Sequence, residues 1–452
     1  MKKYFLLFIV CFAIFITHLI LVRHGIYGDG NGYYTYTQAL YFEKSLNFGP
    51  IYNHLEKFQG IKGEFSRIFW DTSSNPFPIG TGIIWVPSIA IISLFTADRF
   101  SIVYEVGPGL TGILLVMGGL YFLEKYLQNF FSKNIAFFSV LFFFLTSNLF
   151  YYSSFEPALS HQPAFFLISF LLWKTYNMPS KNFNYFLVGA LSGLLFITRV
   201  PDIILLIPIY WQILKSSPSV KNWTTILISA IIFSLPLFWS YYAMFGDPFR
   251  MPYLSSGIGR FTFSITKIME FLFTAKRGLF TWTPIYIFGF IGLMTSSPPF
   301  WRGIPPKEDG ISAFNSSVSS SLAVFLNTVI KSRKLIFLLS LTILILVCSF
   351  WASSSVEFGQ RFVVGGIPYF AFGLAKFIEK LNIKYTAILF ILLLTWNLLT
   401  IFQFYFDKAD LIKNDNLTFL MFFKGQFESP IKAFGIIKDR GLNYLIYKKI
   451  LY

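Results

Sequence analysis

The chain has 452 residues, of which 55% are hydrophobic and only 13% are charged. Soluble domains carry about 25% charged residues, so this composition excludes a soluble globular protein and indicates an integral membrane protein. The net charge of +16 is scattered over short loops between apolar segments. This pattern indicates membrane orientation and contact with lipid headgroups, and it argues against nucleic-acid binding.

The first apolar run extends from Tyr4 to Val22 and follows Lys2 and Lys3. Its length matches the ~20 residues that cross a bilayer, and no small-residue cleavage site follows it. We therefore expect an uncleaved first transmembrane helix with its N-terminus in the cytoplasm, most naturally in the cell inner (cytoplasmic) membrane.

Residues 23–100 then form a long polar loop, which we place outside the cytoplasm. Its glycines and aromatic residues predict short amphipathic helices that lie on the membrane. The apolar piece 83–95 is interrupted by Pro87. A run this short favours an interfacial or re-entrant segment over a full crossing.

Ten further apolar spans follow, which gives an all-α polytopic membrane protein with about eleven transmembrane helices. They are expected at 102–123, 135–152, 158–176, 185–199, 200–214, 223–244, 280–296, 335–351, 361–378 and 385–405. Every loop that alternation places in the cytoplasm carries Lys or Arg, as the positive-inside rule requires. Counting 83–95 as a crossing would invert this pattern.

The spans suggest a division of the chain into parts. Residues 1–296 form an N-terminal transmembrane module that includes the loop 23–100. The Ser- and Pro-rich stretch 297–334 is a cytoplasmic linker. Residues 335–405 form C-terminal transmembrane helices, and 406–452 form an amphipathic basic tail whose side of the membrane stays open.

The first loop contains the main catalytic candidate, Asp29, in a segment with four glycines and several tyrosines. Glycine lets the backbone approach a ligand closely, and a carboxylate between aromatic rings suits a base that meets a sugar. Tyr33 and Tyr34 are the matching substrate-binding candidates. The alternative is a solvated glycine-rich turn with tyrosines at the membrane interface.

Other polar residues collect on the same predicted side. Glu156 and His161 are further substrate-binding candidates, although Ser160 beside them can simply cap a helix. Lys276, Arg277 and Arg361 flank spans from outside, where basic residues are disfavoured. A phosphate would explain this placement, because Lys and Arg bind phosphate by charge and by fork geometry.

The histidines and cysteines show no metal-ligand spacing. No metal site is therefore predicted, and a need for a divalent cation stays open.

Taken in order, these segments resemble the C-type (GT-C) membrane glycosyltransferases, a group that includes protein O-mannosyltransferases and aminoarabinose transferases. The segments that carry the resemblance are Asp29–Tyr36 (DGNGYYTY), Asn75–Gly80 (NPFPIG), Ser160-His161, Lys276–Phe280 (KRGLF) and Phe358–Phe362 (FGQRF). The resemblance covers the chain from residue 1 to about 405, in family order. One departure is that Gly30 follows Asp29 where many relatives carry a second acid.

The resemblance implies an extracytoplasmic active site and inverting transfer of a sugar from a polyprenyl-phosphate donor to a lipid, glycan or protein acceptor. Asp29 matches the catalytic carboxylate, and the basic residues would hold the phosphate. Membrane lipids are further partners. The alternatives are a flippase or transporter of lipid-linked sugars, or a polymerase or ligase of surface polysaccharide.

Overall fold

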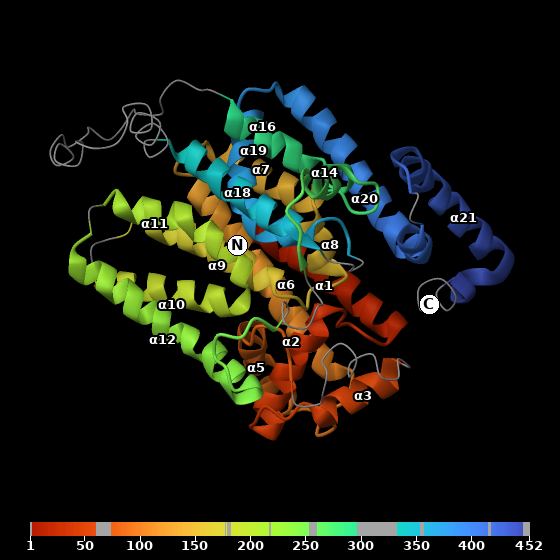
Figure 1. The fold of residues 1–452 in the computed structure, drawn as a ribbon. Helices are drawn as coiled ribbons and strands as arrows, with labels where there is room; N and C mark the ends of the chain where they lie inside the picture. The colour runs from red at the N-terminus through yellow and green to blue at the C-terminus, as the bar shows by residue number, and fades with distance from the viewer. Residues whose placement is uncertain are drawn as a thin grey trace.

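The computed structural model describes residues 2–59, 74–176, 178, 182–216, 218–252, 260–295, 332–352, 357–414 and 417–445. Most of the predicted linker 297–334, and part of the first loop, lie outside these residues. The described chain is almost entirely helical (Figure 1). It also contains one antiparallel pair of two-residue strands, β1 (Arg260–Phe261) and β2 (Trp351–Ala352).

The helices of the first half begin with α1 and end with α12. In chain order they are α1 (Lys2–Val22), α2 (Asp29–Gln38), η1 (Ala39–Glu43), α3 (Gly49–Gln59), α5 (Gly80–Ile92), α6 (Val103–Leu127), α7 (Lys133–Thr146), α8 (Asn148–Ser154), α9 (His161–Tyr176), α10 (Asn182–Thr198), η2 (Val200–Leu206), α11 (Ile207–Leu214) and α12 (Val220–Phe245).

The helices of the second half follow the same order. They are α14 (Ile265–Phe273), α15 (Leu279–Trp282), α16 (Ile285–Met294), α18 (Arg333–Phe350), η3 (Arg361–Gly366), α19 (Ile367–Ile378), α20 (Ile383–Lys413) and α21 (Phe419–Leu445).

Each predicted span falls on one helix or on two consecutive helical segments. Six helices in the described chain are long and apolar enough to cross a membrane, which confirms a membrane protein of helical type. A seventh candidate is the pair α7 and α8, whose axes differ by 70°. Other predicted spans are shorter apolar helices, among them Phe183–Thr198, Val200–Leu214 and Ile285–Met294. The total of about eleven crossings therefore remains a prediction.

α1 and α6 lie antiparallel. At one end Lys3 Nζ lies 2.7 Å from Glu124 Oε1, and Tyr4 donates to Glu124 Oε2. At the other end the backbone N–H of Gly25 donates to Glu105 Oε2. This pairing places the start of the first loop beside the start of α6, away from the N-terminus.

Two basic residues assigned to the cytoplasmic side, Arg333 and Lys376, lie close together at one end of the bundle. The guanidinium of Arg333 lies over the rings of Phe130 and Tyr176, at 4.2 Å and 5.1 Å from their centroids. Lys376 lies 4.9 Å from the ring of Phe131. Their common placement agrees with a single basic face, whose orientation in a membrane remains a prediction.

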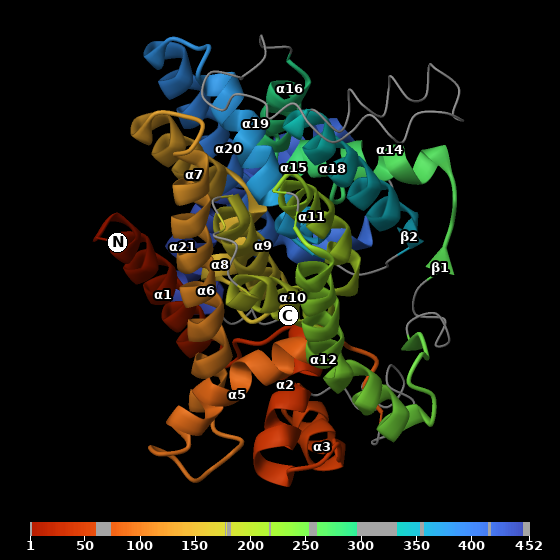
Figure 2. The ribbon, with the colours of Figure 1, turned by 90° about the vertical axis from the view of Figure 1, so that its left-hand side faces the viewer.

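The helices of the first loop gather at the other end. Figure 2 shows α2, α3 and α5 near the bottom of the view, beside the lower ends of the long helices α6 and α12. α2 differs from the amphipathic surface helix that the sequence suggested, because every residue after Asp29 in it is buried. Gly30 and Gly32 allow this burial, since a Cβ on either would meet Ala158 or the ring of Phe77 within 2.4 Å.

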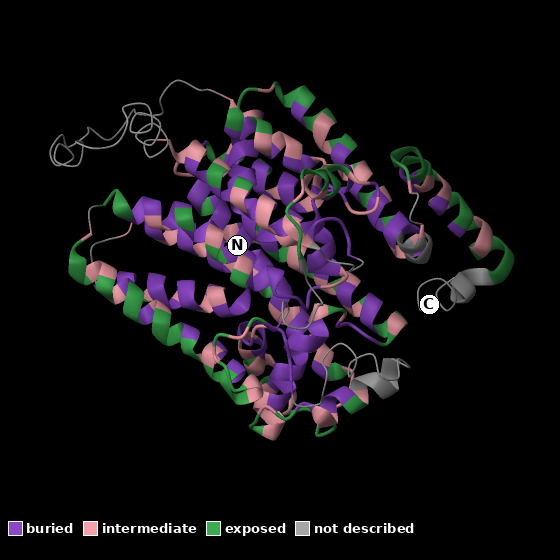
Figure 3. Cartoon of the chain, viewed as in Figure 1, coloured by how far each residue is buried: buried purple, intermediate pink, exposed green. Residues whose placement is uncertain are grey.

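The C-terminal helix α21 packs on α20. Gln426 donates to the hydroxyl of Thr400 at 2.7 Å, and both side chains are fully buried. The predicted boundary at residues 405 and 406 lies within α20, next to a kink at Asp407. Buried residues fill the interior of the molecule, whereas α12, α20 and α21 carry many exposed residues (Figure 3).

Candidate active site

Asp29 is the first residue of α2 and remains partly accessible. Its side chain is 35% exposed, whereas the rest of the helix is buried. The preceding Gly28 has φ of 51° and ψ of −126°, a conformation that favours glycine. A carboxylate at a helix N-terminus is stabilised by the helix dipole. The turn therefore presents one negative charge at the edge of a buried helix.

Arg361, the first residue of η3, is the ion-pair partner of Asp29. Its Nη2 donates to Asp29 Oδ2 at 2.7 Å, and its side chain is 7% exposed. The same guanidinium contacts Glu357, whose Oε2 lies 2.6 Å from Nε. Gly359, with φ of 58°, makes the turn between these two residues. One arginine thus bridges a carboxylate at the surface and a carboxylate in the interior.

Glu357 extends the network to a second arginine. Nη1 of Arg277 lies 4.0 Å from Glu357 Oε1. Burial raises the pKa of Glu357, and the charge of Arg361 opposes this shift most strongly. The sequence analysis did not assign Glu357 a role. The available signal was that Arg361 follows Glu357 by four residues in the sequence.

The loop that carries Glu357 and Arg361 is fixed by hydrogen bonds from neighbouring helices. Asn148, at the start of α8, donates to the carbonyl oxygen of Gln360 at 3.0 Å. Tyr286 of α16 in turn donates to Asn148 at 2.8 Å. Tyr152 donates to the carbonyl oxygen of Phe358 at 3.1 Å. Buried hydrogen bonds of this kind hold the arginine in one orientation.

A second buried ion pair lies beside this loop. Nε of Arg199 donates to Asp202 Oδ1 at 3.0 Å, and its Nη2 donates to the carbonyl oxygen of Phe362 at 3.2 Å. Both ionic side chains are almost completely buried. The sequence analysis did not assign this pair to the site.

Two of the other predicted residues lie near these charges. Tyr33 donates to the hydroxyl of Ser160 at 3.1 Å, and burial together with the charge of Asp29 raises the pKa of Tyr33 to about 12. His161 is buried against Phe362, and its Nδ1 has no hydrogen-bond partner in the described part of the chain. The positive charges of Arg199 and Arg361 lie close enough to interact with the imidazole ring of His161. Tyr33 and His161 therefore border the ion-pair network.

The remaining predicted residues are placed differently. The hydroxyl of Tyr34 accepts from Gln38 at 2.6 Å and lines a separate small cavity with Arg23 and Glu105. Glu156 accepts from Tyr151 at 2.8 Å. Lys276 lies next to Arg277 in the turn between α14 and α15. Ion pairs through Glu357 thus connect Asp29, Arg277 and Arg361 of the predicted set.

The described residues include no group of three or more His, Cys, Asp or Glu side chains that could hold a metal ion. Comparison of the chain with models of protein families, with curated proteins and with solved structures found no match.

Proposed function

We propose that this protein is an integral membrane glycosyltransferase of the GT-C type. It would move a sugar from a polyprenyl-phosphate donor to an extracytoplasmic acceptor with inversion. The observation that carries the proposal is the ion pair between Asp29 and Arg361. It sets a partly exposed carboxylate beside a guanidinium at the end of a bundle of apolar helices.

Asp29 acts as the general base. Its Oδ2 is held by Arg361, and its Oδ1 has no hydrogen-bond partner among the described residues. Oδ1 takes the proton of an acceptor hydroxyl, whose oxygen forms a bond to the anomeric carbon from the face opposite the phosphate. General base catalysis of this kind typically contributes about 10²–10⁴-fold.

The arginines stabilise the leaving group. As the bond between the anomeric carbon and the phosphate oxygen breaks, its electron pair departs with the polyprenyl phosphate. Nη1 of Arg361 has no hydrogen-bond partner in the described chain, so it can donate to a phosphate oxygen. Arg277 adds a second positive charge through its contact with Glu357. Fixed cations of this kind stabilise negative charge as it develops in the transition state.

A transfer assay in proteoliposomes tests the proposal. Radiolabelled polyprenyl-phosphate sugars are supplied one at a time, and movement of label into a new product is measured beside flipping of the intact donor. The proposal expects a new labelled product with at least one donor. Flipping of donors without any labelled product would contradict it and would favour a lipid-linked sugar transporter.

A further inference from the structure

A groove lies between α10 and α12, at the end of α12 remote from Asp29. The far end of α12 contacts the Asp29 helix, because the hydroxyl of Tyr36 in α2 lies 3.8 Å from the sulfur of Met244. The groove begins instead at Val220, the first residue of α12. At about 1.5 Å per residue, the two places are about 36 Å apart along the helix. The groove is therefore a separate site from the one described above.

The packing of the two helices explains why the groove is there. Further along, α10 and α12 touch backbone to backbone, since a Cβ on Gly189 would lie 2.2 Å from the carbonyl oxygen of Ile226. A Cβ on Gly193 would likewise lie 2.4 Å from the carbonyl oxygen of Ala230. Before these glycines, Phe186 of α10 lines an open cavity of about 360 Å³ beside α12.

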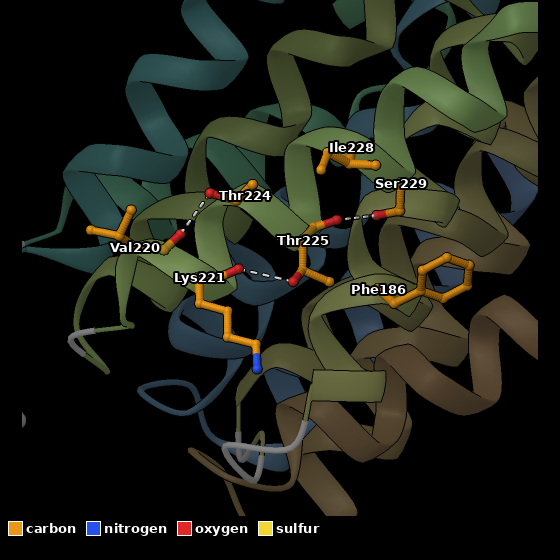
Figure 4. A pocket seen from close by; sticks show the side chains of 7 residues that line it. All are labelled: Phe186, Val220, Lys221, Thr224, Thr225, Ile228 and Ser229. Carbon is orange, nitrogen blue, oxygen red and sulfur yellow. Dashed lines mark hydrogen bonds between the residues drawn. The ribbon is translucent and has the colours of Figure 1, made fainter.

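The walls of the groove present mainly apolar atoms, because their hydroxyl groups are already hydrogen-bonded within α12. The hydroxyls of Thr224, Thr225 and Ser229 donate to backbone carbonyls of their own helix, as Figure 4 shows. Phe186 and Ile228 are 40% and 52% exposed. α12 is one of the helices long and apolar enough to cross a membrane. An exposed apolar wall on such a helix meets lipid acyl chains.

The mouth of the groove is positively charged. Lys221 lies in the first turn of α12, about two turns before Ile228. Gly189 approaches Ile226, and four residues later Gly193 approaches Ala230, so α10 and α12 run parallel. Both helices therefore begin at this end of the groove. Helix N-termini carry partial positive charge and attract phosphate. A ligand with a phosphate above an acyl chain complements both parts of the groove.

We propose that this groove binds one anionic glycerophospholipid of the surrounding membrane. The acyl chain lies along Phe186 and Ile228, and the phosphate lies at Lys221. The inference does not depend on the proposed transferase activity, because its evidence is the shape and charge of a remote surface.

Native mass spectrometry of the purified full-length protein tests the proposal. Phosphatidylglycerol and phosphatidylcholine are titrated separately, and the bound lipids are counted. We expect wild type to retain one phosphatidylglycerol more strongly than phosphatidylcholine. Lys221→Gln should weaken phosphatidylglycerol binding by about fivefold, as expected for one basic residue near a lipid phosphate.

Two further variants keep the test specific. Lys133→Gln removes an exposed basic residue from the start of α7, outside the groove, and should leave lipid binding unchanged. Ile228→Trp fills the groove and should weaken binding of both lipids. Equal retention of the two lipids by wild type would overturn the proposal, as would equal losses in Lys221→Gln and Lys133→Gln. Displacement of the lipid by inorganic phosphate at the same concentration would also overturn it.

Discussion

Arg361 joins Asp29 across 332 residues of sequence, through a contact of 2.7 Å between Nη2 and Oδ2. The pair connects the first loop of the chain to the segment before α19. Since Glu357 contacts the same guanidinium, the three side chains act as one unit, and the consequences of changing them are coupled.

The first prediction concerns the coupling of Arg361 and Glu357. Arg361→Met removes the closest cation from the buried Glu357 and leaves the longer contact to Arg277, so we expect a loss of stability of about 3–5 kcal/mol. Changing Glu357 to Met in the same protein removes the buried carboxylate as well and should restore much of that loss. Unfolding of both single variants and the double variant in detergent measures the coupling. Additive effects, within about 0.5 kcal/mol, would contradict a direct pair.

The second prediction concerns pH. Burial raises the folded-state pKa of Glu357 above its ordinary value of 4.5. The folded protein therefore binds this proton more tightly than the unfolded chain does. The resulting stability is present at low pH and is lost as the pH rises through the folded-state pKa.

Glu357→Gln should accordingly gain thermal stability relative to wild type as the pH rises from 4 upwards. The difference should shrink at low pH, where Glu357 is protonated and resembles glutamine. Melting temperatures of both proteins across this range measure the effect. A difference that does not change with pH would count against a raised pKa.

The third prediction separates the two adjacent tyrosines. Tyr33→Phe removes the hydrogen bond to Ser160 next to His161, so we expect transfer to fall by about 2- to 10-fold, the value of one such bond. Tyr34→Phe alters a separate cavity and should leave transfer unchanged. Initial rates of both variants decide the point, and equal losses would mean that Tyr34 also serves the site.

The fourth prediction concerns the close approach of Gly30 to the loop before α9. A Cβ at Gly30 would lie 2.4 Å from the carbonyl oxygen of Ala158. Gly30→Ala should therefore shift α2 and cost about 1–3 kcal/mol of stability, with reduced transfer. Gly435→Ala is the matched control, because nothing lies within 4 Å of its Cβ position. A melting temperature of Gly30→Ala equal to that of wild type would contradict the prediction, since the loop that carries Ala158 would then move aside at no cost.

The sequence predicted the helical elements well because apolar runs report directly on burial in lipid or protein. It did not predict the bend between α7 and α8, which were read as one span. Ser147 has an extended conformation and its hydroxyl accepts from the N–H of Leu149, so it ends one helix and caps the next. A Ser-Asn pair inside an apolar run was the available signal.

The candidate site was predictable only in part. Asp29 and Arg361 were each singled out from local sequence, but their pairing depends on a contact that no local pattern encodes. Tyr34 was grouped with Tyr33 because they are adjacent, whereas consecutive helical residues point in different directions. The burial of α2 was missed because polar glycine-rich sequence suggested a surface, and the close packing that glycine permits was not visible without its neighbours.

The measurement that tests the account most directly is the rate of sugar transfer by Asp29→Asn. Asparagine keeps the shape of the side chain but cannot accept the proton, so transfer should fall by about 10²–10⁴-fold while the melting temperature stays near that of wild type. Asp98→Asn is the control, since Asp98 is an exposed carboxylate in the same first loop. Wild-type transfer by Asp29→Asn would contradict the assignment of Asp29 as the base.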